Sequence, residues 1–496
     1  MEKVAIIEMN ESNIKLIILD TAPGGYYNVF DKIIENVKLG QVVDKDGLIS
    51  SAKINETLTV LKLFRKVCDC NGVERVVSIA TSFVREAKNQ KSFFDEIYNN
   101  TTFAFTILNT EEEVRAIYSG VINFVDEPKG VLVDVESNYT YIIQYNRRTM
   151  LNFHAIPYGA VTFANSETKY PEILEIIKKE MDKVEFVKNL EEDMPFIGAG
   201  GIMLSVGRLA KKVTHYPLDI DNNYVVTNSA FEAVFNKVKD LDLDKTQKLK
   251  GISEDRADSL VSGMAIVKAV MNSLDAEQFT ICGTGLEDGL ICNYVVPEIN
   301  DKPLSDMLTY SLDTIRMFYD RPNSNTENVY NLAIILFKQL KVMHKLPRAY
   351  IKALRIASSM YDCGTRVNFN NFANYSFEII VNSRFNGVSH KDLLLAGFAC
   401  KYQNLDNISL SDWVKYKDIL TEEDLDAVRK LGVIVNLAAS LDRSRNQNVY
   451  DISCDILGDS IIMKTLVKND SEFDIRQGMK VGADFKKVLK KYLQII

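Results

Sequence analysis

Two short segments carry the residues with which this chain could attack an anionic substrate. Arg85 lies in the segment ATSFVREAKN, and Glu113 lies in NTEEEVRAIYSG. A glutamate can orient or deprotonate a water molecule, and a guanidinium group binds phosphate oxygens through parallel N–H groups. If the fold brings both side chains to opposite walls of one cleft, they supply a base and a clamp for an anionic group. Alternatively, the three successive glutamates that end at Glu113 form a solvated first helical turn, where acidic residues favour the helix dipole.

Two loops offer polar groups around such a cleft. The first follows the apolar run VAII and reads EMNESN, and the second follows GVLV and reads DVESNYTY. Glycine, which lets backbone N–H groups approach an anion closely, is absent from both loops. Asparagine can also adopt the left-handed conformation. The residues that we expect to contact phosphate in these loops are Asn10, Ser12, Asn13 and Asn138.

The same two loops carry an unusual amount of negative charge. Glu11 and Glu136 would lie where a phosphate binds, and two like charges within about 4 Å repel by roughly 4 kcal/mol at an effective dielectric constant of about 20. A divalent cation would reverse this effect. Carboxylate oxygens are ligands that Mg²⁺ accepts. We therefore expect Mg²⁺ as a cofactor, with Asp134 and Glu8 as its ligands.

These segments resemble the Ppx/GppA family of exopolyphosphatases and guanosine pentaphosphate phosphatases, and the resemblance covers nearly the whole chain. Further segments that carry it are PYGAV (157–161), IGAGGIMLSVGRLAKK (197–212), GTGLEDGL (283–290) and NLAASLDRSRNQNV (436–449). The resemblance implies two ribonuclease-H-like lobes of the actin and sugar-kinase superfamily, with the active site in the cleft between them. It also implies polyphosphate or a guanosine polyphosphate as the ligand, and a homodimer.

The resemblance assigns roles to three residues that this chain retains. Glu113 matches the glutamate that activates water, Arg85 matches the arginine that faces phosphate, and Asp134 matches the aspartate that opens the second phosphate loop. Gly200 and Gly201 belong to a third glycine turn, which either binds phosphate or packs a helix against a strand.

The loops themselves depart from the family pattern. The family carries D-x-G-S-N-S in the first loop and D-I-G-G-G-S-T-E in the second. Here the glycine positions read Asn10 and Glu136-Ser137-Asn138, and Tyr141 stands where the second loop ends in glutamate.

The periodicity of apolar residues indicates an α/β protein with three domains. Short β-rich runs and a helical stretch alternate in residues 1–125, and a similar pattern restarts in residues 126–302. This repetition predicts two similar lobes. Helical periodicity dominates residues 303–496, for which the resemblance implies an all-α, HD-like domain.

The HD-like domain lacks the histidines that would hold a metal ion. The positions that match the family's ligands read Asn328, Tyr361-Asp362, Tyr375, Gln403 and Asp442. None of the four histidines occupies such a position. We therefore expect no metal there.

Composition limits the class of protein. Residues 1–300 contain 32 Lys and Arg against 44 Asp and Glu, and residues 301–496 contain 27 against 23. An acidic front half is a poor surface for collecting polyanions, because its field repels them unless a local basic groove or a bound cation intervenes. The chain shows no long apolar run and no apolar leader, and its seven cysteines are scattered. We therefore expect a cytoplasmic protein without disulfides, nucleic acid or membrane partners.

Two functions remain open from the sequence. Retention of Glu113 and Arg85 favours a phosphoanhydride hydrolase, and the departures of the two loops from the family pattern imply that this activity is weak or lost. The acidic loops without glycine, together with Tyr141, favour a non-catalytic relative that binds a ligand or regulates a partner. Hydrolysis of polyphosphate or guanosine pentaphosphate is the test that separates them.

Overall fold

The computed structural model describes residues 1–39, 47–81, 84–85, 87–164, 168–252, 256–296, 303–318, 323–402 and 410–496. The chain forms two compact units, Met1–Tyr310 and Ser311–Ile496. Residue 302, the predicted end of the second lobe, lies outside the described residues. The first unit contains two mixed sheets, and the second contains a helical body with a small sheet.

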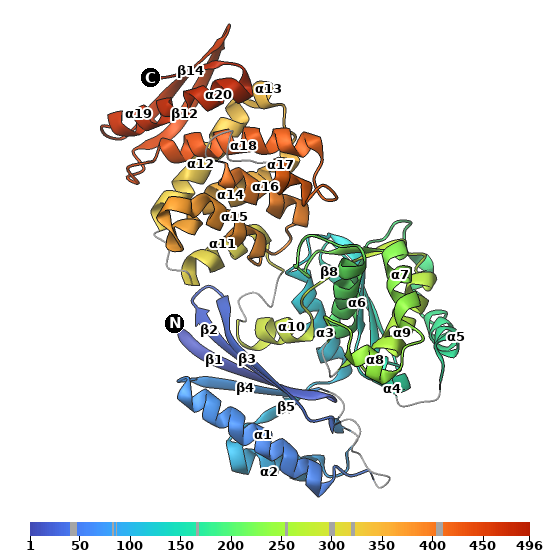
Figure 1. Ribbon diagram of the computed structural model, residues 1–496. Coiled ribbons are helices and arrows are strands. Elements are labelled where there is room, and N and C mark those ends of the chain that lie inside the picture. The colour runs from blue at the N-terminus through green and yellow to red at the C-terminus, as the bar shows by residue number, and fades with distance from the viewer. Residues whose placement is uncertain are drawn as a thin grey trace. The chain divides into compact units, whose positions relative to one another are not determined.

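The first sheet has the strand order β3-β2-β1-β4-β5. Its strands are β1 (Glu2–Met9), β2 (Asn13–Ala22), β3 (Tyr26–Asn36), β4 (Arg75–Ala80) and β5 (Phe105–Ile107). The first three strands are antiparallel neighbours, and β4 and β5 continue in parallel from β1. Helices α1 (Ser51–Cys70) and α2 (Gln90–Thr101) cover one face (Figure 1).

Strand β1 is apolar from Val4 to Ile7 because both of its faces are buried. Ala5 and Ile7 pack in the core under α1 and α2, whereas Val4 and Ile6 pack with residues of α10 (Leu286–Tyr294). A strand covered on both faces needs a continuous apolar run.

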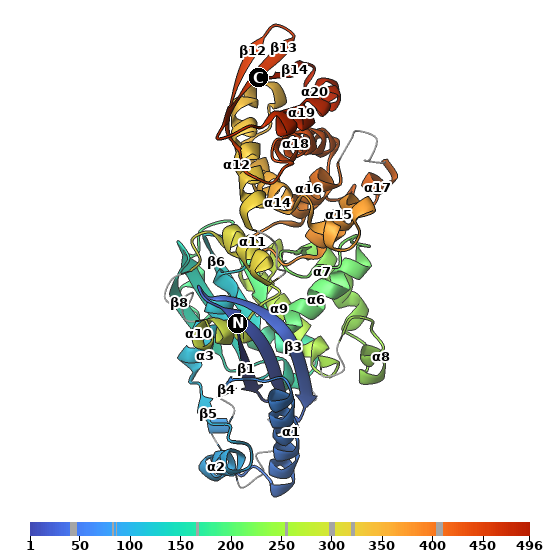
Figure 2. The ribbon, with the colours of Figure 1, turned by 90° about the vertical axis from the view of Figure 1, so that its left-hand side faces the viewer.

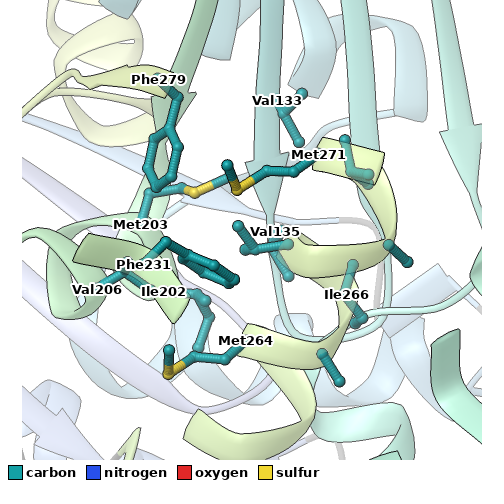
Figure 3. Close-up of a cluster of buried hydrophobic side chains, with 14 of the residues drawn as sticks. Val133, Val135, Ile202, Met203, Val206, Phe231, Met264, Ile266, Met271 and Phe279 are labelled. Carbon is teal, nitrogen blue, oxygen red and sulfur yellow. The ribbon is translucent and has the colours of Figure 1, made fainter. Parts of the chain in front are cut away.

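The second sheet has the order β10-β11-β9-β6-β7-β8. Its strands are β6 (Lys129–Val135), β7 (Thr140–Asn146), β8 (Thr149–Ile156), β9 (Phe196–Ala199), β10 (Val225–Thr227) and β11 (Gln278–Ile281). The helices of this lobe are α4 (Ala160–Ala164), α5 (Tyr170–Met181), α6 (Gly200–Val213), α7 (Asn228–Val238), α8 (Leu243–Gln247) and α9 (Leu260–Ser273). Figure 3 shows Met203, Phe231 and Phe279 packed together in its core.

The two sheets repeat one topology, as the sequence predicts. In each, three antiparallel strands are followed by two parallel ones, in the orders β3-β2-β1-β4-β5 and β8-β7-β6-β9-β11. Helices α3 (Thr110–Ile122) and α10 cross between the sheets at two glycines. A Cβ atom at Gly289 would lie 1.7 Å from the Ala116 carbonyl oxygen, and one at Gly120 would lie 2.0 Å from that of Gly285. This close crossing fixes one lobe against the other.

The second unit is not all-α, and this corrects the sequence prediction. A three-stranded sheet with the order β12-β13-β14 consists of β12 (Val449–Leu457), β13 (Ser460–Val467) and β14 (Tyr492–Ile495). A turn with Gly458 at φ +54° joins the first two strands, and Ile461 and Met463 alternate toward the buried side. This period of two is short and stands beside a longer helical pattern, which dominates the sequence of the second unit. Figure 2 shows the sheet next to α19 (Glu472–Lys480) and α20 (Gly482–Leu489).

Most of the helical body lies earlier in the second unit. Its helices are α12 (Asn323–Gln339), α13 (Lys341–His344), α14 (Ile351–Met360), α15 (Phe372–Asn382), α16 (His390–Lys401), α17 (Leu410–Val414) and α18 (Glu422–Ser440), and α11 (Met307–Phe318) spans the boundary between the units. Among the described residues, no helix combines the length and the apolar character that crossing a bilayer requires.

Candidate active site

The first loop keeps its shape without glycine because Asn10 bridges it. The Asn10 Oδ1 atom accepts hydrogen bonds from the backbone N–H groups of Ser12 (2.9 Å) and Asn13 (2.8 Å). Its Nδ2 group donates to Glu8 Oε1 at 2.9 Å. Two N–H groups that could have bound phosphate are therefore occupied by the loop's own side chain.

The second loop faces the first. The Glu136 N–H group donates to the Tyr139 carbonyl at 2.9 Å, and the Glu136 carbonyl accepts from the Ala160 N–H group. The hydroxyl groups of Ser12 and Ser137 lie 3.3 Å apart and connect the two loops. The structure thus brings both predicted loops together, with Asn138 near Glu11.

A cavity of about 200 Å³ lies between the two lobes. The described residues that line it come from both loops, from strands β2 and β3, from the starts of α6 and α10 and from the segment before α9. They include Glu8, Asn10, Ser12, Asn13, Lys15, Lys32, Glu136, Ser137, Gly200, Gly201, Arg256, Gly283, Gly285 and Glu287. Of the predicted phosphate contacts, Asn10, Ser12, Asn13, Gly200 and Gly201 line this cavity, whereas Asn138 lines a neighbouring one.

Two helices begin at this cavity without a capping side chain. Ala199 is the N-cap of α6 and Gly285 is the N-cap of α10, and neither provides a side-chain hydrogen bond to the first turn. The first N–H groups of a helix have no partner within the helix, and they attract anions together with the helix dipole. Two separate helix starts therefore present anion-binding N–H groups to the cavity.

Arg256 adds a fixed positive charge that the sequence analysis did not assign to the site. Its Nη1 group donates to the Gly201 carbonyl at 3.2 Å. A Cβ atom on residue 201 would lie 2.3 Å from the Arg256 Cζ atom, so glycine is needed for the guanidinium group to lie here. Arg256 immediately follows residues outside the described part of the chain, within the segment EDRADSL.

Lys15 is a second cation that the sequence analysis missed. Its Nζ atom lies 2.9 and 3.0 Å from the two carboxylate oxygens of Glu8 and 3.9 Å from Glu287. Burial alone would raise the pKa of Glu8, but the charge and hydrogen bonds of Lys15, aided by Asn10, outweigh burial and hold that pKa below its ordinary value. Glu8 is therefore a paired anion, and its oxygens are already occupied.

Asp134 lies next to Gly200 and Gly285, two glycines that line the cavity, in an unusual environment. It is fully buried, and neither carboxylate oxygen has a hydrogen-bond donor in the described part of the chain. Burial, followed by the charge of Glu136, raises its pKa well above the ordinary value. Gly200, at φ +79°, leaves space for it, because a Cβ atom there would lie 1.9 Å from Asp134 Oδ1. A buried carboxyl group without a donor marks a place for a proton or a cation.

Glu113 occupies a smaller cavity of about 30 Å³ that shares Asn10, Glu136 and Ser137 with the larger one. It is 4% exposed in the first turns of α3, so the alternative of a solvated glutamate is wrong for this side chain. The Tyr141 hydroxyl donates a hydrogen bond to Glu113 Oε2 at 2.7 Å. Glu11 also lines this cavity, and burial raises its pKa to about 7.

Arg85 does not line either of these two cavities. Its side chain is exposed, and its Nη2 group donates to the Thr110 hydroxyl at 3.3 Å. The structure therefore brings Glu113, Glu8 and Asp134 to the cleft region and leaves Arg85 outside it, next to residues 82, 83 and 86, which are not described.

The predicted magnesium ligands are only partly suitable. In the described residues, no three Asp, Glu, His or Cys side chains are gathered so that they could hold a metal ion. The carboxylate oxygens of Glu8 are paired with Lys15, so Glu8 is not suited to bind a metal ion. Asp134 does fit, because its two oxygens have no donor, and Mg²⁺ commonly takes one or two carboxylates together with phosphate oxygens and water.

The HD-like positions are occupied by interactions within the protein. Asn328 Nδ2 donates to the Val449 carbonyl at 3.2 Å, Asp362 forms an ion pair with Arg445 at 3.0 Å, and Asp442 Oδ1 accepts from the Gln447 N–H group. Gln403, another predicted position, lies outside the described residues. The absence of a metal there stays a prediction.

Comparisons with known proteins agree on one family. A family model described as the Ppx/GppA phosphatase family matches residues 17–297. The chain is 23% identical over 397 residues to the guanosine-5'-triphosphate,3'-diphosphate pyrophosphatase of Aeromonas salmonicida, and the match covers 76% of each chain.

Solved structures share the fold of the part of this chain that they cover. The Ppx/GppA family member of Aquifex aeolicus matches with a TM-score of 0.52 and 22% identity, over 60% of this chain and 98% of that one. An exopolyphosphatase from Cytophaga hutchinsonii matches with a TM-score of 0.54 and 18% identity, over 61% of this chain and 99% of that one.

Proposed function

Because the chain belongs to the Ppx/GppA phosphatase family, we propose that it hydrolyses a terminal phosphoanhydride bond of polyphosphate or of guanosine pentaphosphate. The observation that carries this proposal is the convergence of two uncapped helix starts and Arg256 on one cavity, beside the buried carboxylate of Glu113. The helix starts and Arg256 bind an anion, and the Glu113 carboxylate accepts a proton.

The reaction divides between the two cavities. Arg256 and the N–H groups at the starts of α6 and α10 bind the oxygens of the terminal phosphoryl group in the larger cavity. A water molecule beside Glu113 attacks phosphorus, its proton passes to the Glu113 carboxylate, and the bond to the bridging oxygen breaks. Lys15 keeps Glu8 neutralised, so that this carboxylate does not repel the substrate.

Magnesium is part of the proposal, with Asp134 as the residue that would hold it. When bound, the ion would supply positive charge to phosphate oxygens. Arg85 remains a candidate phosphate ligand, outside the two cavities. The homodimer and the cytoplasmic location also remain predictions.

The alternative, a non-catalytic protein that binds a ligand, is favoured by a different observation. Asn10 occupies two N–H groups of the first loop, and the carboxyl groups of Glu11 and Glu136 stand beside the cavity. Burial raises the pKa of both groups. A weaker phosphate site, used for binding alone, would follow from these changes.

Phosphate release separates the two functions. The full chain would be incubated with long-chain polyphosphate or guanosine pentaphosphate and Mg²⁺, beside Glu113→Gln and the matched variant Glu111→Gln, which changes an exposed glutamate on the same helix. Release that Glu113→Gln abolishes and Glu111→Gln retains supports the hydrolase. Binding by calorimetry without release from either substrate supports the non-catalytic alternative.

A further inference from the structure

Tyr141 connects the second sheet to the candidate base. It lies on β7 opposite Asp134 of β6, and its ring is 2% exposed. Its hydroxyl group crosses to α3 and donates to Glu113 Oε2 at 2.7 Å, which is within the range of a strong hydrogen bond to a carboxylate. Burial, followed by the charge of Glu113, raises the pKa of Tyr141 far above its ordinary value. The hydroxyl group thus keeps its proton and remains a donor.

The charges around Glu113 make this donor important. Glu11 and Glu136 line the same small cavity as Glu113. Two neighbouring carboxyl groups oppose ionisation of Glu113, whereas a hydrogen bond donated to a carboxylate favours the ionised form. Only the ionised form can accept a proton from water.

The small cavity has the size of a water site. Its volume of about 30 Å³ exceeds the roughly 10–15 Å³ that one water molecule needs. It is lined by the carboxyl groups of Glu113 and Glu11 and by the side chain of Asn138, so that it offers the polar partners an ordered water requires.

We propose that Tyr141 is a positioning residue for the hydrolysis: its hydroxyl group holds the Glu113 carboxylate ionised and in one orientation against the cavity that takes the attacking water. The inference rests on the proposed function. Tyr141 touches Glu113 and acts through it, and it does not contact the phosphate-binding groups at Arg256. Its removal should therefore change the rate of the chemical step and not the binding of substrate.

Tyr141→Phe removes the donor and keeps the ring. Its matched control is Tyr118→Phe on α3, because the Tyr118 hydroxyl is buried and has no hydrogen-bond partner in the described part of the chain. For polyphosphate hydrolysis we expect Tyr141→Phe to lower kcat by about 10-fold with KM unchanged, and to move the acidic limb of the pH profile to higher pH. Tyr118→Phe should match the wild-type protein. Unchanged kcat in Tyr141→Phe, or an equal loss in both variants, would overturn the proposal.

A second measurement does not need activity. Carbon-13 labelling of glutamate side chains, with Glu113→Gln used for assignment, gives the pKa of Glu113 directly by NMR titration. We expect this pKa to be higher in Tyr141→Phe than in the wild type and unchanged in Tyr118→Phe. An unchanged pKa in Tyr141→Phe overturns the role of Tyr141 even if the enzyme is active. A raised pKa in a protein that releases no phosphate shows instead that the proposed function, and with it a role in hydrolysis, is wrong.

Discussion

Glu11 should make the first unit less stable as the pH rises through neutrality. Its pKa is raised from 4.5 to about 7 by burial, by Glu136 and by Glu113, with partial opposition from Asn138 and Ser137. A raised pKa means that the folded protein binds the proton more tightly than the unfolded chain does. Stability is therefore lost as the pH rises from about 4.5 to about 7, and the full cost is present above that range.

The size of this effect follows from the shift. At about 1.4 kcal/mol per pKa unit, the cost of an ionised Glu11 is about 3 kcal/mol at pH 8 and only about 1 kcal/mol at pH 5. Glu11→Gln removes the charge and keeps the shape. It should increase the free energy of unfolding by these amounts, which at roughly 2 °C per kcal/mol is about 6 °C in melting temperature at pH 8.

Calorimetry of the full chain at pH 5 and pH 8 tests this expectation. The control is Glu35→Gln, which changes an exposed glutamate on β3 of the same sheet. Stabilisation by Glu11→Gln that is the same at both pH values, or absent at pH 8, would refute the reasoning, because the cost would then not come from ionisation of a buried group.

Three further substitutions test the cleft. Lys15→Met should destabilise the first unit by about 3–5 kcal/mol at pH 8, because it leaves the buried Glu8 carboxylate without its cation. The loss should be smaller at pH 5, where Glu8 then takes a proton. Denaturant unfolding at the two pH values measures both free energies. Gly200→Ala should cost more than about 2 kcal/mol, since φ is +79° and the added Cβ atom would meet Asp134 Oδ1; an unchanged melting temperature would contradict it. Arg256→Lys should raise KM for polyphosphate about 10-fold with little change in kcat, because lysine lacks the planar, forked guanidinium group that binds two oxygens at once. A lower kcat with an unchanged KM in steady-state kinetics would mean instead that Arg256 acts in the chemical step.

The sequence predicts local features of the site well. Asn109 caps α3 and Glu112 completes a capping box, so the helix start that carries Glu113 follows from neighbouring residues alone. The duplicated lobes also follow from local patterns, because each sheet begins with the same succession of short strands.

Contacts between distant segments were harder to predict. One partner of Glu113 is Tyr141, on a strand of the second sheet, and no periodicity connects the two residues. Lys15 could have been found, because the turn at residues 10–12 places Glu8 and Lys15 opposite each other in adjacent strands. An acid and a lysine that face one another in two otherwise apolar strands are a signal of a buried ion pair.

For Arg85, the site predicted from the sequence and the structure differ. The sequence places both in segments that resemble one family's active site, yet the guanidinium group of Arg85 is exposed and contacts Thr110. The arginine that lines the larger cavity among the described residues is Arg256, whose position depends on the absence of a side chain at Gly201. Such a fit between a long side chain and a glycine is decided by packing and is not visible in residue spacing.

The most direct test of the account is a single-turnover reaction in ¹⁸O-labelled water, with the protein in excess over polyphosphate and Mg²⁺ present. We expect each phosphate released by the wild-type protein to carry one labelled oxygen, and Glu113→Gln to reduce the rate by at least about 100-fold. Absence of labelled phosphate, or release at the wild-type rate by Glu113→Gln, would contradict hydrolysis at this cleft with Glu113 as the base.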